Sequence, residues 1–158
     1  MIIFINGSIN SGKSTIAKRL SEKIPNSIVL EIDVLRDFIK FVSLDKAIPI
    51  NLENAVSLTK NFINHNFSVI IPYPLSKKNY NFLFEGLRDV KEKIYTFTLN
   101  PSIETVLEGR GRTLTGWEKE RIKHHYKIKI NKPDFGMIID NSHQTPDETT
   151  NQILTLLK

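Results

Sequence analysis

A glycine-framed stretch near the start of the chain constrains the fold more than any other feature. It reads Gly7-Ser8-Ile9-Asn10-Ser11-Gly12-Lys13-Ser14 and lies between an apolar run, 1–5, and an amphipathic stretch, 14–24. The stretch therefore connects an expected strand to an expected helix. Glycine at positions 7 and 12 lets the backbone turn tightly and approach an anion without a Cβ atom in the way. Successive backbone N–H groups and the start of the helix then favour a bound phosphate.

The residues at the end of this stretch have expected partners on a nucleoside triphosphate. Lys13 is expected to reach the β- and γ-phosphates, the Ser14 hydroxyl to coordinate Mg²⁺, and Thr15 to add a donor near the α-phosphate. The pattern thus predicts a P-loop, the alternative being a chance match in a turn rich in glycine and serine. The expected nucleotide contacts are Gly7, Ser8, Asn10, Ser11, Gly12, Lys13, Ser14 and Thr15. A P-loop indicates triphosphate binding but not the reaction that follows.

Short apolar runs alternate with longer amphipathic stretches along the whole chain. Strands are expected at 1–5, 27–30, 68–71, 94–99 and 136–139. Helices are expected at 14–24, after residue 33, at 52–64 and at 76–90, and three more have marked starts at Asn100-Pro101, Thr115 and Thr145. This alternation predicts an α/β fold, a three-layer α/β/α sandwich around a parallel sheet, with residues 1–158 as one domain.

Composition excludes several classes of protein. The 158 residues include no cysteine, which rules out disulfide scaffolds and thiolate zinc sites. The longest apolar run, 1–5, is far shorter than the roughly 20 residues that span a bilayer, and no basic region precedes it as in a signal peptide. We therefore expect a soluble cytoplasmic protein with no membrane partner. Lysine and arginine exceed aspartate and glutamate by 22 to 17, and the net charge of +5 favours anionic partners such as nucleotides, phosphorylated metabolites or nucleic acid.

Two acidic residues and an arginine directly follow the second expected strand. Alternation along a strand would put Glu31 and Asp33 on the same side, at the sheet edge where ligands of open α/β sheets bind. Asp33 could then accept a proton from an attacking hydroxyl, Glu31 could hold a Mg²⁺-bound water, and Arg36 could fix an anionic group of the acceptor. Alternatively, Asp33 caps the following helix and Arg36 pairs with it or with Asp37.

A second basic group lies in the glycine-rich segment 109–116. Glycines flank and separate Arg110 and Arg112 between the end of one helix and the capping box of the next. This hinge-like arrangement favours a mobile lid whose guanidinium groups neutralise a transferring phosphoryl group and exclude water, with Arg121 as a weaker third candidate. The alternative is an ordinary polar turn with solvated arginines.

Three aromatic residues that follow Arg112 are expected to have structural roles. His124 and His125 are adjacent on an expected helix, so they point in different directions and cannot form a metal pair one turn apart; a surface or packing role is expected. Trp117 is expected to provide packing contacts for the same helix. The last helix is expected to dock on the core through Ile153, Leu154, Leu156 and Leu157.

With the loop, the post-strand acids and the arginine segment in this order, the chain resembles the adenylate-kinase class of P-loop kinases. It is most similar to the small phosphotransferases that include the chloramphenicol phosphotransferase-like and shikimate-kinase-like proteins. The resemblance covers nearly the whole chain and rests on 7–15, Glu31-Ile32-Asp33 with Arg36, Arg110-Gly111-Arg112, and 138–142 followed by 145–148. It implies strand order 2-3-1-4-5, a short lid at 109–116, Asp33 as catalytic base, and a loop including Asn141 that flanks adenine.

The end of the third expected strand departs from this resemblance. Many relatives have an acidic residue there, whereas this chain reads Ile70-Ile71-Pro72-Tyr73-Pro74. Either Glu31 and Asp33 serve the metal, or catalysis is weak or absent. Tyr73 could instead shape the acceptor pocket.

The sequence as a whole predicts an ATP- and Mg²⁺-dependent kinase that transfers the γ-phosphate to a hydroxyl group of a small molecule. The expected catalytic residues are Lys13, Asp33, Arg110 and Arg112, with Arg36 and Tyr73 at the acceptor. Two alternatives stay open: a kinase that phosphorylates a nucleotide or the 5′ end of a polynucleotide, and a nucleotide-binding module without transfer activity.

Overall fold

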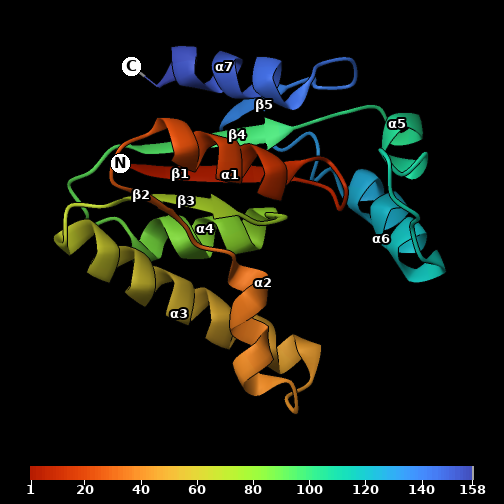
Figure 1. Ribbon diagram of the computed structural model, residues 1–158. Coiled ribbons are helices and arrows are strands. Elements are labelled where there is room, and N and C mark those ends of the chain that lie inside the picture. Colours follow the sequence, from red (N-terminus) through yellow and green to blue (C-terminus); the bar gives the residue numbers. More distant parts are fainter. Residues whose placement is uncertain (158) are drawn as a thin grey trace.

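The computed structural model describes residues 1–157 and contains one parallel sheet of five strands (Figure 1). The strands are β1 (Ile2–Gly7), β2 (Ser27–Val29), β3 (Ser68–Pro72), β4 (Ile94–Leu99) and β5 (Met137–Ile139). Their order, β2-β3-β1-β4-β5, confirms the order 2-3-1-4-5. Because β1 pairs with β3 on one side and β4 on the other, all six of its residues are buried.

Helices cover both faces of the sheet, which confirms the three-layer architecture (Figure 1). Two of them, α1 (Lys13–Lys23) and α7 (Pro146–Leu156), pack on one face. On the other face lie α3 (Leu44–Asn64) and α4 (Lys77–Gly86). Alternate residues of β1 serve the two faces, since Ile3 and Ile5 contact the α1 side and Ile2 and Phe4 the α3 side.

Two helical arms extend beyond these layers at the carboxyl ends of the strands (Figure 1). One arm consists of α2 (Ile32–Leu35), the 3₁₀ helix η1 (Arg36–Ile39) and the start of α3. The other consists of α5 (Ile103–Leu107) and α6 (Gly116–Lys127) and has a small core of its own around Val106, Leu114 and Ile122. The loop that joins β1 to α1, residues 7–14 and called the phosphate loop below, lies between the two arms.

Local capping signals locate most but not all helix starts. Thr115 and Thr145 both form capping boxes, as the sequence predicts. The start expected at Asn100-Pro101 is wrong, because the cap is Ser102, whose hydroxyl accepts a hydrogen bond from the Thr105 N–H group. The start expected at residue 52 is also wrong, since α3 begins eight residues earlier and includes Pro49 in its second turn.

The last helix docks on the core largely as expected. Ile153 is fully buried, and Leu154 and Leu157 pack against the cluster around α1. Leu156 does not take part, because 38% of its surface is exposed. Within residues 1–157, no helix is both long and apolar enough to cross a membrane.

Candidate functional site

The loop between β1 and α1 has the backbone geometry of an anion receptor. Gly7 and Gly12 have φ angles of 145° and 100°, and a Cβ atom on Gly7 would lie 2.5 Å from the Ser11 hydroxyl oxygen and 2.8 Å from the Leu99 carbonyl oxygen. Gly12 is the N-cap of α1, whose first turn has neither a side-chain cap nor an acidic residue. The N–H groups at the start of α1 are therefore available to a phosphate.

Lys13 is held by the loop itself. Its ammonium group donates a hydrogen bond to the Ser8 carbonyl oxygen at 2.6 Å. Burial lowers the pKa of Lys13 to about 8, and the carboxylates of Asp33 and Glu31 act in the opposite direction. The ammonium group thus lies within electrostatic reach of both acids that follow β2.

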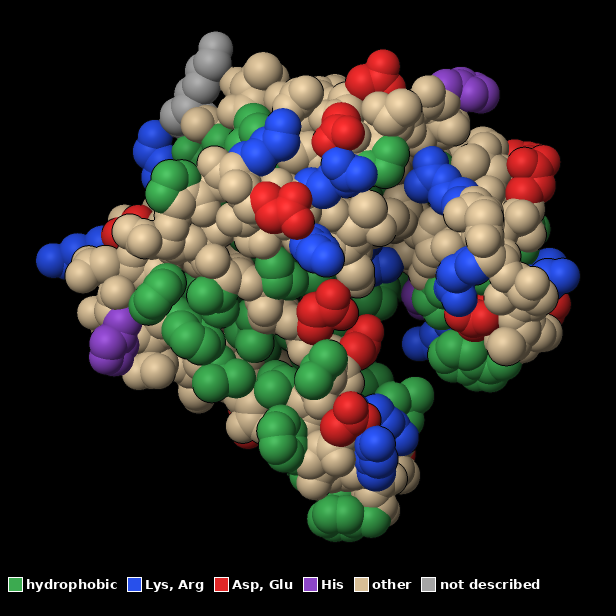
Figure 2. Space-filling model, viewed as in Figure 1, with side chains coloured by type: hydrophobic (Ala, Val, Ile, Leu, Met, Phe, Trp, Pro, Cys, Tyr) green, Lys and Arg blue, Asp and Glu red, His purple; other side chains and the backbone are tan. Residues whose placement is uncertain are grey.

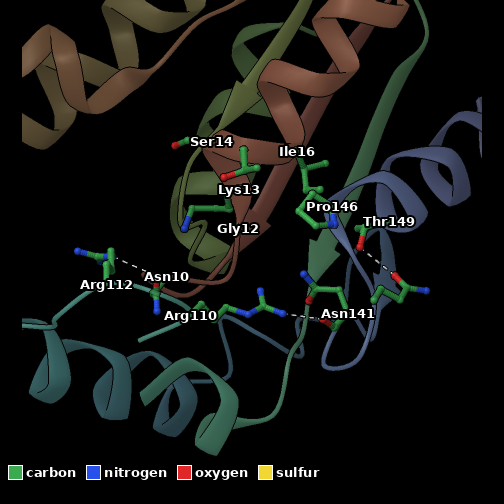
Figure 3. Close-up of a pocket in the computed structure, with 12 residues that line it drawn as sticks. Asn10, Gly12, Lys13, Ser14, Ile16, Arg110, Arg112, Asn141, Pro146 and Thr149 are labelled. Atoms are coloured by element: carbon green, nitrogen blue, oxygen red, sulfur yellow. Dashed lines mark hydrogen bonds between the residues drawn. The ribbon is translucent and has the colours of Figure 1, made fainter. Parts of the chain in front are cut away.

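A cavity of about 540 Å³ opens beside the loop (Figure 3). Its walls come from the loop and α1, from the segment between α5 and α6, and from the residues after β5. The lining residues are Asn10, Gly12, Lys13, Ser14, Thr15, Ile16, Arg110, Arg112, Asn141, Gln144, Pro146 and Thr149. Of the predicted nucleotide contacts, Gly7, Ser8 and Ser11 do not line this cavity; all three are buried in the body of the loop.

Arg110 and Asn141 join the outer walls of the cavity to the loop. The Asn141 amide and one Arg110 nitrogen both donate to the Ser11 carbonyl oxygen, at 3.0 and 2.9 Å. Another Arg110 nitrogen donates to the Asn141 carbonyl oxygen at 2.6 Å (Figure 3). Partial burial lowers the pKa of Arg110. Two backbone carbonyls therefore fix this guanidinium group at the cavity wall.

Arg112 is held much less tightly. Its Nε donates to the Asn10 side-chain oxygen at 3.1 Å (Figure 3), and one terminal nitrogen forms an ion pair with Glu118 at 2.8 Å. The side chain of Arg112 is 48% exposed. Exposed pairs of this kind contribute about 0–1 kcal/mol, so the guanidinium group can change partners at little cost.

The two acids after β2 do not lie on a strand. The strand ends at Val29, Glu31 is the N-cap of α2, and Asp33 lies in its first turn, so the alternation argument is wrong. Asp33 does not cap the helix either. Burial raises the pKa of Asp33, the positive charge of Lys13 lowers it, and the Glu31 carboxylate raises it further. The two acids therefore act on the charge of Lys13 from the start of a helix and not from one side of a strand.

Arg36 has none of the ionic partners that the alternative interpretation requires. In the described part of the chain it forms no ion pair, and Asp37 pairs with Lys40 instead, at 3.1 Å. One terminal nitrogen of Arg36, Nη1, is buried without a hydrogen-bond partner.

Tyr73 lies at the end of β3, between the two arms. It is 8% exposed, and burial together with the Asp33 carboxylate raises its pKa to about 12, while Arg121 acts in the opposite direction. The charges of an acid from one arm and of a guanidinium group from the other therefore both act on the phenol. This second part of the site adjoins Lys13 but does not line the cavity in Figure 3.

Sequence reasoning missed two buried residues near the loop, His125 and Asn6, and misplaced the aromatic residue Trp117. His125 is 2% exposed and contacts Ser8, so neither a surface role nor simple packing describes it. Asn6 is fully buried at the end of β1 and bonds to three separate segments. A polar residue in an otherwise apolar strand directly before the loop was a signal for Asn6. Trp117, expected to pack, is 67% exposed at the start of α6.

The residues present fit a magnesium ion that is held mainly by nucleotide phosphates. Among residues 1–157 there is no group of three or more His, Cys, Asp or Glu side chains that could hold a metal by themselves. Ser14 and Glu31 line one groove beside α1. Mg²⁺ in nucleotide sites usually has one or two protein ligands and takes the rest from phosphates and water, which this pair satisfies.

Solved structures resemble this chain over nearly its full length. A sugar kinase from Janibacter sp. HTCC2649 is 18% identical with a TM-score of 0.77, and the alignment covers 99% of this chain and 93% of that one. The APS kinase CysC of Mycobacterium tuberculosis, in complex with AMPPNP and APS, is 16% identical with a TM-score of 0.74 over 99% and 96%. This chain has the fold of the P-loop kinases. The tunicamycin resistance protein of Deinococcus radiodurans shares the fold as well, at 20% identity and a TM-score of 0.72 over 99% and 94%. No protein-family model and no curated protein sequence matches the chain.

Proposed function

We propose that the protein is an ATP- and Mg²⁺-dependent kinase that transfers the γ-phosphate of ATP to a hydroxyl group of a small molecule. The observation that carries this proposal is the meeting of the phosphate loop and a carboxylate at Lys13. Asp33 and Glu31 both act on the Lys13 ammonium group, although they belong to the start of α2 and not to the loop. A phosphate donor and an acceptor hydroxyl can therefore be brought together at this point. The proposed kinase domain spans 1–158.

The cavity in Figure 3 is the proposed ATP site. The phosphates would be held by the amide groups of the loop, by the start of α1 and by Lys13. Ser8 and Ser11, which are buried, would keep the loop in shape. Asn141 and Arg110 would flank the base, since they form the wall beyond the loop. Ser14 and Glu31 would hold Mg²⁺, which supplies neutralisation of phosphate charge when it is bound.

Asp33 is the proposed general base. It takes the proton from the acceptor hydroxyl, whose oxygen then attacks the γ-phosphorus while the bond to the β-phosphate oxygen breaks and ADP leaves. Burial already raises the pKa of Asp33 and so increases its affinity for a proton. Arg36 and Tyr73 would line the acceptor pocket, where the unpaired nitrogen of Arg36 offers a hydrogen-bond donor to an acceptor oxygen.

The segment 109–116 is the proposed lid, and its two arginines would have different duties. Arg112, with its exposed ion pair to Glu118, can turn toward the transferring phosphoryl group at small cost. Arg110 is fixed by two backbone carbonyls and would act from the wall of the nucleotide site. The residues 109, 110 and 111 all have positive φ, from 47° to 90°, so this turn has an unusual conformation at its hinge end.

An ADP-release screen tests the proposal. The protein is incubated with Mg²⁺ and ATP against hydroxyl-bearing metabolites, sugars, nucleosides, antibiotics and oligonucleotides, with Lys13→Ala as the blank. We expect one small-molecule class to give ADP release well above the blank and a product whose mass is increased by one phosphoryl group. If the protein binds AMPPNP tightly but releases no ADP from ATP with any acceptor, the result would contradict a kinase and support the binding-module alternative.

The alternative of a kinase for nucleotides or polynucleotide ends is favoured by the net charge of +5. This alternative predicts that the protein binds oligonucleotides with an affinity that falls steeply as the salt concentration rises. Phosphorylation of an oligonucleotide 5′ end in the same screen, in preference to every small molecule, would replace the small-molecule proposal.

A further inference from the structure

The side chain of His125 reaches from α6 into the phosphate loop. Its Nδ1 lies 3.3 Å from the Ser8 hydroxyl oxygen, and both residues are almost completely buried, at 2% and 0% exposure. The neighbouring loop residue Ile9 packs against Val106, Leu114 and Ile122, the small core of the same arm. The arm therefore contacts the loop at consecutive residues, Ser8 and Ile9. It also contacts the next residue, Asn10, whose amide nitrogen donates to the Val106 carbonyl oxygen at 3.0 Å and whose amide oxygen accepts from Arg112.

Ser8 is also the residue that holds Lys13. Its carbonyl oxygen accepts the hydrogen bond from the Lys13 ammonium group at 2.6 Å. One loop residue thus has its hydroxyl bonded to the arm and its carbonyl bonded to the lysine. A shift or rotation of Ser8 would move both partners, because the two groups belong to the same short segment.

The imidazole contacts Ser8 as a neutral group. Burial lowers the pKa of His125 to about 4, and the charged groups that act on it, Arg121, Lys13 and His124, lower it further. At neutral pH the ring therefore adds no positive charge beside Lys13. Its Nδ1 pairs with the Ser8 hydroxyl as donor or as acceptor, according to the tautomer.

We propose that His125 is a positioning residue for Lys13: its hydrogen bond to Ser8 fixes the part of the loop from which the lysine is directed at the β- and γ-phosphates. This inference rests on the proposed nucleotide site but not on the identity of the acceptor. It makes α6 part of the machinery for phosphate binding. The segment before α6 is the proposed lid, so movement of the arm would be transmitted to the lysine through Ser8.

Nucleotide binding by calorimetry tests this without any acceptor. His125→Leu removes the polar atom, His125→Asn keeps one near the position of Nδ1, and Ser8→Ala removes the hydroxyl but keeps the carbonyl. The ligands are Mg²⁺-AMPPNP, whose β- and γ-phosphates are the proposed partners of Lys13, and AMP, which lacks them. His124→Leu is the matched control, since His124 is the exposed neighbour.

We expect His125→Leu and Ser8→Ala each to weaken AMPPNP binding by about 2- to 10-fold, the usual range for one hydrogen bond, and to change AMP binding by less than about twofold. His125→Asn should restore most of the loss, and the double variant should be no weaker than either single variant. In a Lys13→Ala background, His125→Leu should have no further effect on AMPPNP. The control should bind both nucleotides like the wild type.

Other results would overturn the inference. Equal losses for AMPPNP and AMP, additive losses in the double variant, or a loss that persists in the Lys13→Ala background would each show a merely structural contact. If His125→Leu does not fold, Ser8→Ala decides, because it removes a single oxygen atom. Wild-type protein that does not bind AMPPNP would refute the nucleotide site and this inference together, whereas binding without phosphoryl transfer would refute the kinase alone.

Discussion

Asn6 is the residue whose replacement should most clearly separate the hydrogen bonds of the site from its packing. It is fully buried at the end of β1. Its carbonyl oxygen accepts from the Leu75 N–H group at 2.7 Å, and its amide group donates to the Thr98 hydroxyl and to the Ile130 carbonyl oxygen, both at 3.0 Å. One amide thus joins the segment after β3, the strand β4 and the segment after α6, directly before the phosphate loop.

Asn6→Leu keeps the approximate volume and removes all three bonds. Two backbone groups, the Leu75 N–H and the Ile130 carbonyl, lose their side-chain partner inside the protein. Each buried unpaired polar group costs about 1–3 kcal/mol, so the free energy of unfolding should fall by about 2–6 kcal/mol. That is a large share of the roughly 5–15 kcal/mol of a typical domain. Urea denaturation followed by far-UV circular dichroism measures it, since the single tryptophan, Trp117, is 67% exposed and a poor reporter of unfolding.

Asn6→Asp separates hydrogen bonding from shape. One oxygen can still accept from Leu75, but the other replaces a donor and faces the Ile130 carbonyl oxygen. Burial raises the pKa of the new carboxyl above its unfolded value, and only its protonated form can donate to Ile130. The hydrogen bond therefore stabilises the fold at low pH and is lost as pH rises through the folded-state pKa. Relative to the wild type, this variant should be less destabilised at pH 5 than at pH 8.

The outcomes that contradict this reasoning are specific. A loss below about 0.5 kcal/mol for Asn6→Leu, which is the usual range for surface changes, would mean that the three bonds contribute nothing measurable. An Asn6→Asp deficit that is the same at pH 5 and pH 8 would mean that the carboxyl is not confined beside Ile130. Asn61→Leu on the exposed face of α3 is the matched control and should stay within that surface range.

Three more outcomes are expected. Because burial lowers the pKa of Lys13 to about 8, the AMPPNP association constant should fall above that pH by up to about tenfold per pH unit, and Lys13→Arg should abolish the dependence in calorimetry. Gly109→Ala should loosen the segment 109–116 to limited proteolysis, since its Cβ would lie 2.0 Å from the Arg112 carbonyl oxygen; Gly111→Ala meets no atom within 4 Å and should cost only about 1–2 kcal/mol of backbone strain. Asp33→Asn should lower kcat by at least about 100-fold with little change in AMPPNP affinity, and the wild-type kcat/KM should fall with decreasing pH through a pKa that burial raises above the ordinary value of an aspartate.

The sequence predicts those parts of the fold that depend on neighbouring residues. The five strands are confirmed because each is a short run rich in apolar residues; β1 in the middle of the sheet is fully buried, whereas the edge strands β2 and β5 are partly exposed. The capping boxes at Thr115 and Thr145 are confirmed because their hydrogen bonds join residues three apart. The start of α3 fails for the opposite reason: Ala47 is buried but Leu44 and Ile50 are exposed on the arm, so the apolar residues of the first turns do not mark a single buried face, and Pro49 interrupts the pattern.

The site is less accessible to sequence reasoning than the fold. The structure does bring Asn10, Lys13, Arg110 and Asn141 to one cavity, whereas their roles there remain predictions. His125 could not be found in this way, since its partner Ser8 is 117 residues away and a helical histidine gives no indication of burial. The error at Trp117 has the same origin, because an aromatic residue next to a cap can pack or project, and only the tertiary contacts decide.

The acids after β2 show how a wrong local argument can still select relevant residues. Strand alternation predicts Glu31 and Asp33 on the same side of a strand, yet they belong to a helix start. They reach Lys13 nevertheless, because every parallel strand of the sheet delivers its carboxyl end to the same edge, whatever conformation follows. The end of β3 at that edge is occupied by the buried phenol of Tyr73, which the Asp33 charge reaches. The two carboxylates thus follow β2, the strand next to β3 at the edge of the sheet, and the topology rather than the alternation accounts for their position.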